Sequence, residues 1–303
     1  MESLRSIKLT APAKLNLALS VGAPGADGMH PIVSWMVTLD FADEMHLTRL
    51  PEESLSAYSI DWHRSAPRRS AIDWSITKDL AVRAHQALEA HVGRSLPLRM
   101  RLQKRIPVGG GLGGGSSNAA AMLRGVVDLF ELGVGDAELL DIAHGLGSDV
   151  PFMLRGGSAV VSGLGEVIER LPEPEPMHFV LACPGFACPT GAVYRAFDAG
   201  GPARLRPEAV RAMAQAATLT SDEPFNDLAT AAAQIAPALA DDAEELAQLI
   251  GLRAHVSGSG SSLFVVCANE VESGAAAAAA RTRLHMAALA VRSAPLGPIL
   301  SDP

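Results

Sequence analysis

A glycine-rich loop constrains this sequence more than any other feature. Six of the seven residues over 109–115 are glycine. The loop follows a run over 98–103 in which apolar and polar residues alternate, as expected for a half-solvated antiparallel strand. It leads into an alanine-rich run over 116–130 that predicts a helix. Because a strand precedes it and a helix follows it, the loop is interpreted as part of a folded site rather than as a linker.

The composition of this loop predicts a phosphate-binding site. Glycines let the backbone approach a ligand closely and turn consecutive N–H groups toward it. The start of the following helix adds unpaired N–H groups and the positive end of the helix dipole. The G-x-G-x-x-G match at Gly109, Gly111 and Gly114 is weak evidence for a dinucleotide site, since any glycine run produces it. Walker A and protein-kinase signatures are absent from the sequence.

Charge and composition limit the partners of the chain. It has 25 Lys and Arg against 33 Asp and Glu, a net charge of −8. This balance argues against nucleic acid and against an anionic membrane, because both favour a basic face. With 48% hydrophobic and 19% charged residues, the 303-residue chain is typical of a soluble globular protein with one large or two ordinary domains.

Three cysteines, Cys183, Cys188 and Cys267, form no C-x-x-C pair and have no Cys or His set nearby. They are therefore interpreted as buried free thiols rather than as disulfides or metal ligands. The sequence has no run of eighteen apolar residues, and its first residues read as a strand rather than a signal peptide. We expect a cytoplasmic protein.

The order of the remaining elements predicts an α+β fold in two lobes, since strands and helices are interleaved without a steady βαβ rhythm. Residues 51–77 are polar and are expected to form a long excursion with at most one strand. The PEPEP stretch at 172–176 is expected to be a joint. The other predictions are strands at 14–21 and 33–41, helices at 79–91 and 136–144, a hairpin at 158–171, a strand at 178–184, helices through 207–250, a strand–loop–strand at 255–268, a helix at 271–283 and a strand at 286–291.

Five motifs in order make the chain resemble the GHMP small-molecule kinases over roughly residues 7–295. They are APAKLNLAL (11–19), DGMH (27–30), IPVGGGLGGGSSNAA (106–120), LGSDVPF (146–152) and VSGSGSSLF (256–264). With PTGAVY (189–194) and FNDL (225–228), the chain is most similar to the branch that phosphorylates the 2-hydroxyl of a diphosphocytidyl-linked methylerythritol in non-mevalonate isoprenoid synthesis.

This resemblance implies a fold and a set of ligands. It implies a ribosomal-protein-S5-like ATP-binding lobe over 1–165 and a ferredoxin-like substrate lobe over 166–303. It also implies ATP and Mg²⁺ as cofactors and a small cytidyl-alditol substrate, with neither nucleic acid nor membrane as a partner. The expected assembly is a monomer or a weak homodimer.

The resemblance also implies roles for individual residues. Lys14 would be a fixed positive charge between the acceptor hydroxyl and the γ-phosphate, and Asp149 the catalytic base. Taken alone, a lysine in a strand is usually a solvated edge residue, and an aspartate in a Gly-Ser-Asp turn is a turn or cap residue. Asn16, on the same face of the strand as Lys14, would bind the substrate, as would His30 at the cytosine edge and Thr190.

The implied phosphate-binding set is the whole loop and the start of the helix after it. Ser117 is also the tentative ligand of Mg²⁺, and Asp227 is expected either near the substrate or as a helix cap. Residues 258–260 are expected to pack against the phosphate loop. The full set is Pro107, Val108, Gly109, Gly110, Gly111, Leu112, Gly113, Gly114, Gly115, Ser116 and Ser117.

Three positions depart from the family pattern. Met29 replaces a tyrosine that stacks on cytosine, Gly25 replaces a common arginine, and Asp79 replaces a frequent asparagine near the nucleotide base. The alternatives are therefore a GHMP kinase for another alcohol, such as mevalonate, homoserine or a sugar, and a non-catalytic nucleotide-binding paralogue. A nucleotide dehydrogenase is disfavoured, because no βαβ pattern surrounds the loop.

Overall fold

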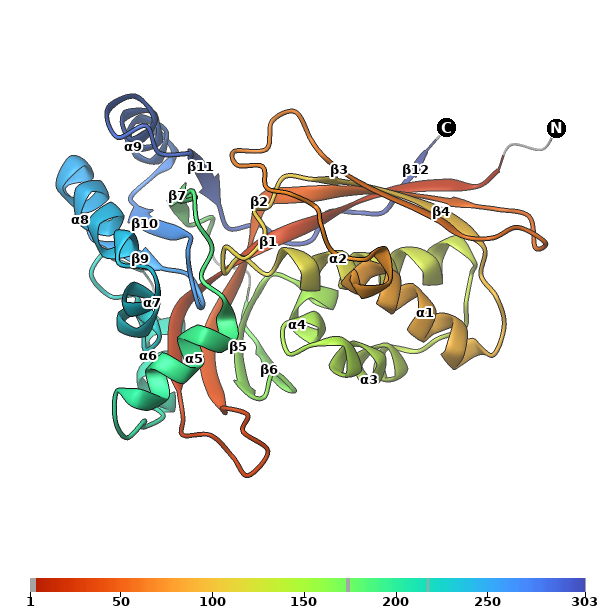
Figure 1. Cartoon of the computed structure of the whole chain (residues 1–303), viewed down its shortest axis with the longest axis horizontal. Coiled ribbons are helices and arrows are strands. Elements are labelled where there is room, and N and C mark those ends of the chain that lie inside the picture. The colour runs from red at the N-terminus through yellow and green to blue at the C-terminus, as the bar shows by residue number, and fades with distance from the viewer. Residues whose placement is uncertain (1–3, 173–174, 217, 303) are drawn as a thin grey trace.

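A long antiparallel ladder between the first two strands joins the two lobes of the molecule (Figure 1). The structure, a computed structural model, describes residues 4–172, 175–216 and 218–302. In the described part the first lobe carries an eight-stranded sheet of order β12-β1-β2-β4-β3, in which β5 pairs with β2 and β6, and β8 with β1. Its strands are β1 (Ser6–Val21), β2 (Ile32–Arg49), β3 (Ala57–Trp62), β4 (Leu98–Lys104), β5 (Ser158–Gly163), β6 (Val167–Arg170), β8 (Phe225–Asn226) and β12 (Leu300–Asp302).

Four helices cover one face of this sheet (Figure 1). They are α1 (Leu80–Val92), α2 (Gly114–Leu129), α3 (Asp136–Leu146) and α4 (Val150–Arg155). The small residues of α2 let it lie close to the sheet, and a Cβ on Gly125 would stand 2.6 Å from Leu47. At the start of α1 the Asp79 carboxylate accepts a hydrogen bond from Ala81 N, so this helix begins with a capped N–H group.

A register irregularity decides which side of the sheet the polar residues of β1 face. The pairing of β1 with β2 shifts between Pro12 and Lys14. Before it, Ile7, Leu9 and Ala11 pack into the core under the helices. After it, the odd-numbered residues from 13 to 17 pack instead into the core shared with the second lobe. Lys14 and Asn16 therefore lie on the side of the sheet that carries the helices.

The second lobe has the ferredoxin-like arrangement that was predicted. Its four-stranded antiparallel sheet has the order β11-β7-β10-β9, which is 4-1-3-2 in chain order. The strands are β7 (His178–Ala182), β9 (Ala254–Val256), β10 (Leu263–Cys267) and β11 (Ala288–Arg292). The helices are α5 (Thr190–Ala199), α6 (Pro207–Ala214), α7 (Ala229–Ile235), α8 (Ala238–Ile250) and α9 (Glu270–Arg283). The predicted α+β fold in two lobes is confirmed.

Several local predictions need correction. Helices α4 and α5 were not expected, because α4 is short and α5 begins within a motif interpreted only as a substrate contact. Strand β4 is antiparallel to β2 as predicted, but β3, from the polar excursion, pairs with it in parallel. The expected lobe boundary at 165/166 lies in the β5–β6 turn, whereas the first sheet continues to Arg170. Residues 173–174 of the predicted joint lie outside the described residues.

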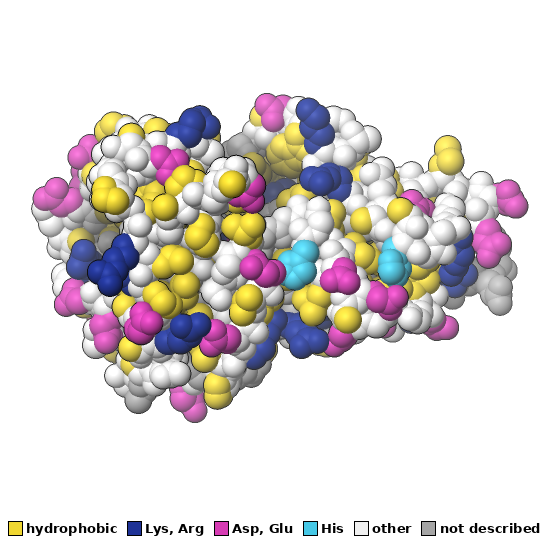
Figure 2. All heavy atoms as spheres, turned by 90° about the horizontal axis from the view of Figure 1, so that it is seen from below, with side chains coloured by type: hydrophobic (Ala, Val, Ile, Leu, Met, Phe, Trp, Pro, Cys, Tyr) yellow, Lys and Arg dark blue, Asp and Glu magenta, His cyan; other side chains and the backbone are white. Residues whose placement is uncertain are grey.

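The three cysteines are free and buried, as predicted. Among the described residues, no helix has the length and apolarity needed to cross a membrane. On the face shown in Figure 2, basic and acidic side chains are interspersed over both lobes.

Candidate active site

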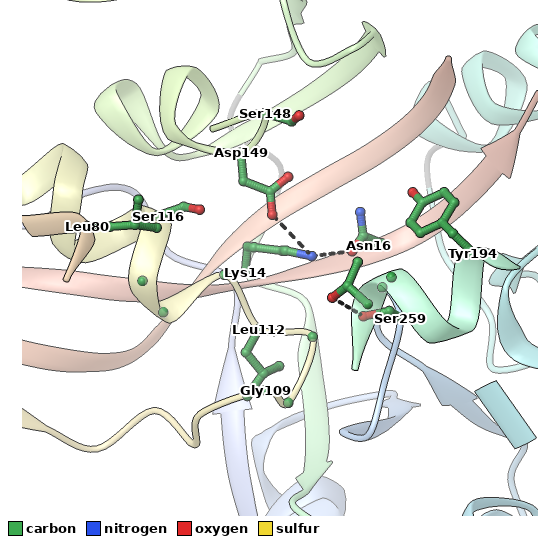
Figure 3. A pocket seen from close by; sticks show the side chains of 18 of the residues that line it. Lys14, Asn16, Leu80, Gly109, Leu112, Ser116, Ser148, Asp149, Tyr194 and Ser259 are labelled. Carbon is green, nitrogen blue, oxygen red and sulfur yellow. Dashed lines mark hydrogen bonds and ion pairs between the residues drawn. The ribbon is translucent and has the colours of Figure 1, made fainter. Parts of the chain in front are cut away.

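A cavity of about 920 Å³ lies where the two lobes meet, and nearly every residue singled out from the sequence lines it. Leu80 and Ser116 lie at one end, Asn16 and Tyr194 at the other, and Lys14 faces Asp149 between them (Figure 3). Residues 107–116 of the predicted phosphate-binding set all contribute to its wall. The site therefore draws on β1, the glycine loop, the starts of α1, α2 and α4, and α5 of the second lobe.

Lys14 is a buried cation with two polar partners, Asn16 and Asp149. Its Nζ donates to Asn16 Oδ1 at 2.5 Å and lies 3.7 Å from Asp149 Oδ2. Burial lowers the pKa of Lys14, and the Asp149 carboxylate opposes this effect. Asn16 in turn donates to Ser34 Oγ at 2.8 Å, and Ser34 donates to Ala18 O at 2.7 Å. This chain of hydrogen bonds fixes the ammonium group in one position.

Asp149 directs its carboxylate into the cavity (Figure 3). The residue precedes α4 at the N-cap position, yet its side chain makes no capping hydrogen bond. About a quarter of the side chain is exposed, and its ion pair is with Lys14. The geometry therefore favours a ligand-facing role for this aspartate over a turn or cap role, because the carboxylate faces the space where a ligand would lie.

The glycine loop is fastened on both sides. Lys14 N donates to Leu112 O at 2.9 Å, which ties the loop to β1. From the second lobe, Ser262 N donates to Gly110 O at 3.0 Å and Ser257 Oγ to Gly111 O at 3.1 Å. Gly111 has φ +74°, and a Cβ there would stand 2.1 Å from Ser257 O. The 257–262 segment therefore packs directly on the loop, as expected for residues 258–260.

The first turn of α2 offers oxygen atoms without protein partners. Ser116 and Asn118 line the cavity, whereas Ser117 is buried and does not. Ser117 Oγ and Asn118 Oδ1 are both buried and without a hydrogen-bond partner. Among the described residues, no group of three His, Cys, Asp or Glu side chains stands ready to hold a metal ion. A cation here would therefore need ligand phosphates as well as these oxygens.

One end of the cavity lies where α1 and α2 begin. Trp74, Lys78, Asp79, Leu80 and Lys104 line it together with the first residues of the loop. Trp74 Nε1 donates to Asp79 Oδ2 at 3.2 Å, so both carboxylate oxygens of Asp79 are used by the protein. Sequence reasoning did not assign Trp74 to the site, because a tryptophan in a polar, non-periodic segment gives no signal of its own.

A buried ion pair fixes the strand that leads into the loop. Lys104 Nζ lies 2.6 Å from Asp43 Oδ2. Asp43 Oδ1 also accepts from Arg105 N at 2.6 Å and from Ile106 N at 2.8 Å. The Asp43 side chain is wholly buried, so these three hydrogen bonds compensate for its desolvation.

The other end of the cavity has aromatic rings. His30 lies against Tyr194, with ring centroids 4.9 Å apart, and edge-on to Phe197 at 6.1 Å. Its Nδ1 donates to Gly22 O at 2.9 Å, and its Nε2 is 3.4 Å from Asp198. Sequence reasoning missed Tyr194, although it closes the PTGAVY motif. Burial raises the pKa of Tyr194 to about 12, and the Asp149 charge adds to this effect.

The remaining residues singled out from the sequence fall around these rings or away from them. Thr190 lines the cavity and shares a 3.0 Å hydrogen bond with Ser259. Met29 stands half-exposed at the rim, and Gly25 lies in the adjoining turn, where it donates to Met29 O. Asp227 does not line the cavity. Its carboxylate accepts from Val21 N and Ser20 Oγ and pairs with Arg206, so it ties β1 to the second lobe instead of capping a helix.

Comparison with known proteins gives consistent matches. Residues 79–157 match the family model of the GHMP kinase N-terminal domain. A 4-diphosphocytidyl-2-C-methyl-D-erythritol kinase of Caulobacter vibrioides (strain NA1000 / CB15N) is 35% identical over 269 residues, which are 86% of this chain and 90% of that protein. A protein of the same name from Geobacillus kaustophilus (strain HTA426) is 38% identical over 189 residues, 62% of each chain.

Solved structures give the same result for the fold. A crystal structure of 4-(cytidine 5'-diphospho)-2C-methyl-D-erythritol kinase superposes with a TM-score of 0.73 at 30% identity, covering 96% of this chain and 99% of that one. Homoserine kinase from Cytophaga hutchinsonii superposes with a TM-score of 0.70 at 16% identity, covering 97% of each chain. At that identity the second likeness concerns the fold alone.

Proposed function

Since the chain belongs to the GHMP kinases, in the 4-diphosphocytidyl-2-C-methyl-D-erythritol kinase branch, we propose that it phosphorylates the 2-hydroxyl of 4-diphosphocytidyl-2-C-methyl-D-erythritol with ATP. This is a step of the non-mevalonate isoprenoid pathway. The observation that carries the proposal is the Lys14–Asp149 pair, which faces the glycine loop inside the cavity between the lobes. The first lobe would hold ATP, and the second would complete the pocket for the alcohol.

Asp149 is proposed to accept the proton of the attacking hydroxyl. Its carboxylate is partly exposed to the cavity and makes no capping bond, so it has oxygen atoms available for a substrate. Phosphoryl transfer has a loose transition state in most analyses, which means that alignment of the hydroxyl matters more than base strength. Lys14 supplies a fixed positive charge near the transferred group.

The buried environment makes Lys14 effective in this role. A charge in a water-excluded site interacts more strongly with a developing negative charge than one in water does. The hydrogen bond to Asn16 holds the ammonium group in place, so no reorganisation is needed when the substrate arrives. Asn16 lines the cavity and is proposed to bind the alcohol as well.

The glycine loop is proposed to hold the phosphates of ATP through its backbone N–H groups and the start of α2. Ser117 Oγ and Asn118 Oδ1 are buried and unpartnered, and Asn118 lines the cavity, so these oxygens are proposed to meet a hard cation that also takes phosphate oxygens. Mg²⁺ bound there would neutralise phosphate charge. The protein's own part is to present these oxygens and to keep Asp149 and Lys14 beside the acceptor.

The aromatic end of the cavity is proposed to bind the cytidyl group. Tyr194 and His30 both line the cavity, and the bond from His30 to Gly22 O fixes the imidazole orientation. Aromatic rings stack favourably on a nucleobase. Met29 at the rim offers polarisable contact instead of a ring face.

The test is a coupled ADP-release assay with Mg-ATP and 4-diphosphocytidyl-2-C-methyl-D-erythritol. We expect substrate-dependent ADP release, and Asp149→Asn should lower kcat by about 10²–10⁴-fold with nearly unchanged ATP affinity. Homoserine, mevalonate and sugars serve as competing acceptors in parallel reactions. ADP release with one of these and none with the cytidyl alcohol would refute the substrate. Full activity of Asp149→Asn would refute the base.

A further inference from the structure

The polar segment between β3 and α1 crosses from one lobe to the other. After β3 ends at Trp62, residues 63–78, here called the crossing segment, run to the start of α1 with one short 3₁₀ turn at Ile76–Lys78. The ends of the segment are fixed to the first lobe. His63 N donates to Lys104 O at 2.9 Å, and Trp74 Nε1 donates to Asp79.

Arg68 fastens the middle of this segment to the second lobe. Its Nη1 donates to Pro184 O at 2.6 Å and to Phe186 O at 2.7 Å. The neighbouring Arg69 is exposed and donates within the segment, to Arg64 O at 2.8 Å. The two arginines have the same chemistry, but the side chain of Arg68 contacts the second lobe and that of Arg69 contacts its own segment.

The loop that Arg68 holds is itself part of the site's frame. Phe186 O also accepts from Ser261 Oγ at 2.5 Å, and Ser261 belongs to the segment packed on the glycine loop. A Cβ built on Gly109 would stand 3.0 Å from the Cβ of Ala187. The 184–187 loop then leads into α5, which begins at Thr190. Arg68 therefore ties the crossing segment to a loop that touches the phosphate-binding backbone.

Two side chains of the crossing segment, Trp74 and Lys78, line the cavity. Trp74 is the one nearer in sequence to Arg68. It lines the cavity beside Asp79 and Leu80, at the end where α2 begins. Its position depends on its bond to Asp79 and on the path of the segment before it. A segment with one short 3₁₀ turn needs anchors along its length to keep one conformation, because each residue that becomes ordered loses conformational entropy.

From these contacts we infer that Arg68 is a positioning residue for the nucleotide: by holding the crossing segment on the 184–187 loop, it fixes Trp74 in the cavity wall where α1 and α2 begin, at the end of the cavity proposed to hold ATP. Arg68 itself does not line the cavity, so it would act through Trp74. The inference rests on the proposed function only in taking the bound nucleotide to be ATP.

The experiment measures the Kd of the non-hydrolysable analogue β,γ-imido-ATP with Mg²⁺ by calorimetry, without the alcohol. Arg68→Ala should raise Kd about tenfold, because binding would then also have to order the crossing segment around Trp74. Arg68→Lys should recover part of that loss, and Arg69→Ala, the matched control, should bind like the wild type. Combined with Trp74→Ala, Arg68→Ala should add little, because both changes remove the same wall.

Three results would overturn the inference. An unchanged Kd in Arg68→Ala, with a lowered melting temperature, would mean that Arg68 only stabilises the fold. Multiplying effects in the double variant would mean that Arg68 does not act through Trp74. If Arg68→Ala does not fold, Trp74→Ala is measured instead. A Kd equal to that of the wild type in Trp74→Ala would show that Trp74 does not contribute to nucleotide binding, and the inference would fail. A wild type that binds the analogue but does not phosphorylate the cytidyl alcohol would refute the proposed function alone.

Discussion

Replacing Gly111 by alanine tests whether the glycine loop must lie where the second lobe holds it. The backbone at Gly111 has φ +74°, a region that costs an L-residue with a Cβ about 1–2 kcal/mol. The new Cβ would also stand 2.1 Å from Ser257 O and 3.0 Å from Gly260 O, where ordinary contact begins at 3.4 Å. Both neighbours are backbone atoms, so neither can rotate away, and the loop must retreat by roughly 1 Å.

A retreat of this size should be costly for phosphoryl transfer. A displacement of about 1 Å can lower the rate of a positioned reaction about 10²-fold, which corresponds to about 2.7 kcal/mol. We expect kcat/KM for ATP to fall by about this factor in the ADP-release assay. The fold should survive, because a strained backbone position costs about 1–3 kcal/mol.

The matched control is Gly274→Ala, in α9, where no atom lies within 4 Å of the added Cβ. It should leave kcat/KM unchanged and stabilise the helix by about 0.5–1 kcal/mol. If Gly111→Ala keeps the kcat/KM of the wild type, the contact between the loop and Ser257 does not position the phosphates, and the reasoning fails.

Three further predictions concern other parts of the structure. Asp43→Asn should lower the free energy of unfolding in urea by about 3–5 kcal/mol, because it leaves Lys104 buried without its carboxylate, and a loss below about 1 kcal/mol would contradict this. Met29→Tyr should lower KM for the cytidyl substrate by the equivalent of about 0.5–1.5 kcal/mol if the added ring stacks on the base, whereas an unchanged KM would exclude stacking there. Burial lowers the pKa of His85 below its usual 6.5. The unfolded state therefore binds more protons than the folded state once the pH is below about 6.5. The free energy of unfolding falls as the pH drops from above about 6.5 through the folded-state pKa. His85→Asn should therefore flatten the dependence of unfolding free energy on pH between about 7 and 5, and an unchanged slope would contradict it.

The sequence predicted the parts of the fold that local patterns specify. The alternation over 98–103, the alanine-rich helix after the loop, and the strands at 14–21 and 33–41 all appear where expected. A run of glycines is informative by itself, because few structures other than a close backbone approach require it. The prediction that residues 258–260 pack on this loop agrees with the bonds from Ser257 and Ser262.

Contacts between distant segments could not be predicted in this way. Trp74, Tyr194 and Arg68 are ordinary residues at ordinary positions, and only the fold brings them to the cavity or to the other lobe. Asp227 is a residue that the sequence did single out, but for a different role. Its motif pointed to the substrate or to a helix cap, whereas its carboxylate holds the end of β1. The sequence also did not determine which side of the sheet the even-numbered residues of β1 face. A register shift near Pro12 moves the side chains that follow it to the opposite side of the sheet.

Asp149 shows how a local signal can separate a structural aspartate from a functional one. An aspartate at the N-cap normally accepts a hydrogen bond from the N–H of the second or third helical residue. In α4 the second position is Pro151, which has no N–H to donate. The carboxylate therefore loses one of its two usual partners and makes no capping bond. It faces the cavity and the ammonium group of Lys14 instead, so the sequence Asp-Val-Pro itself favours an aspartate that is free to meet a substrate.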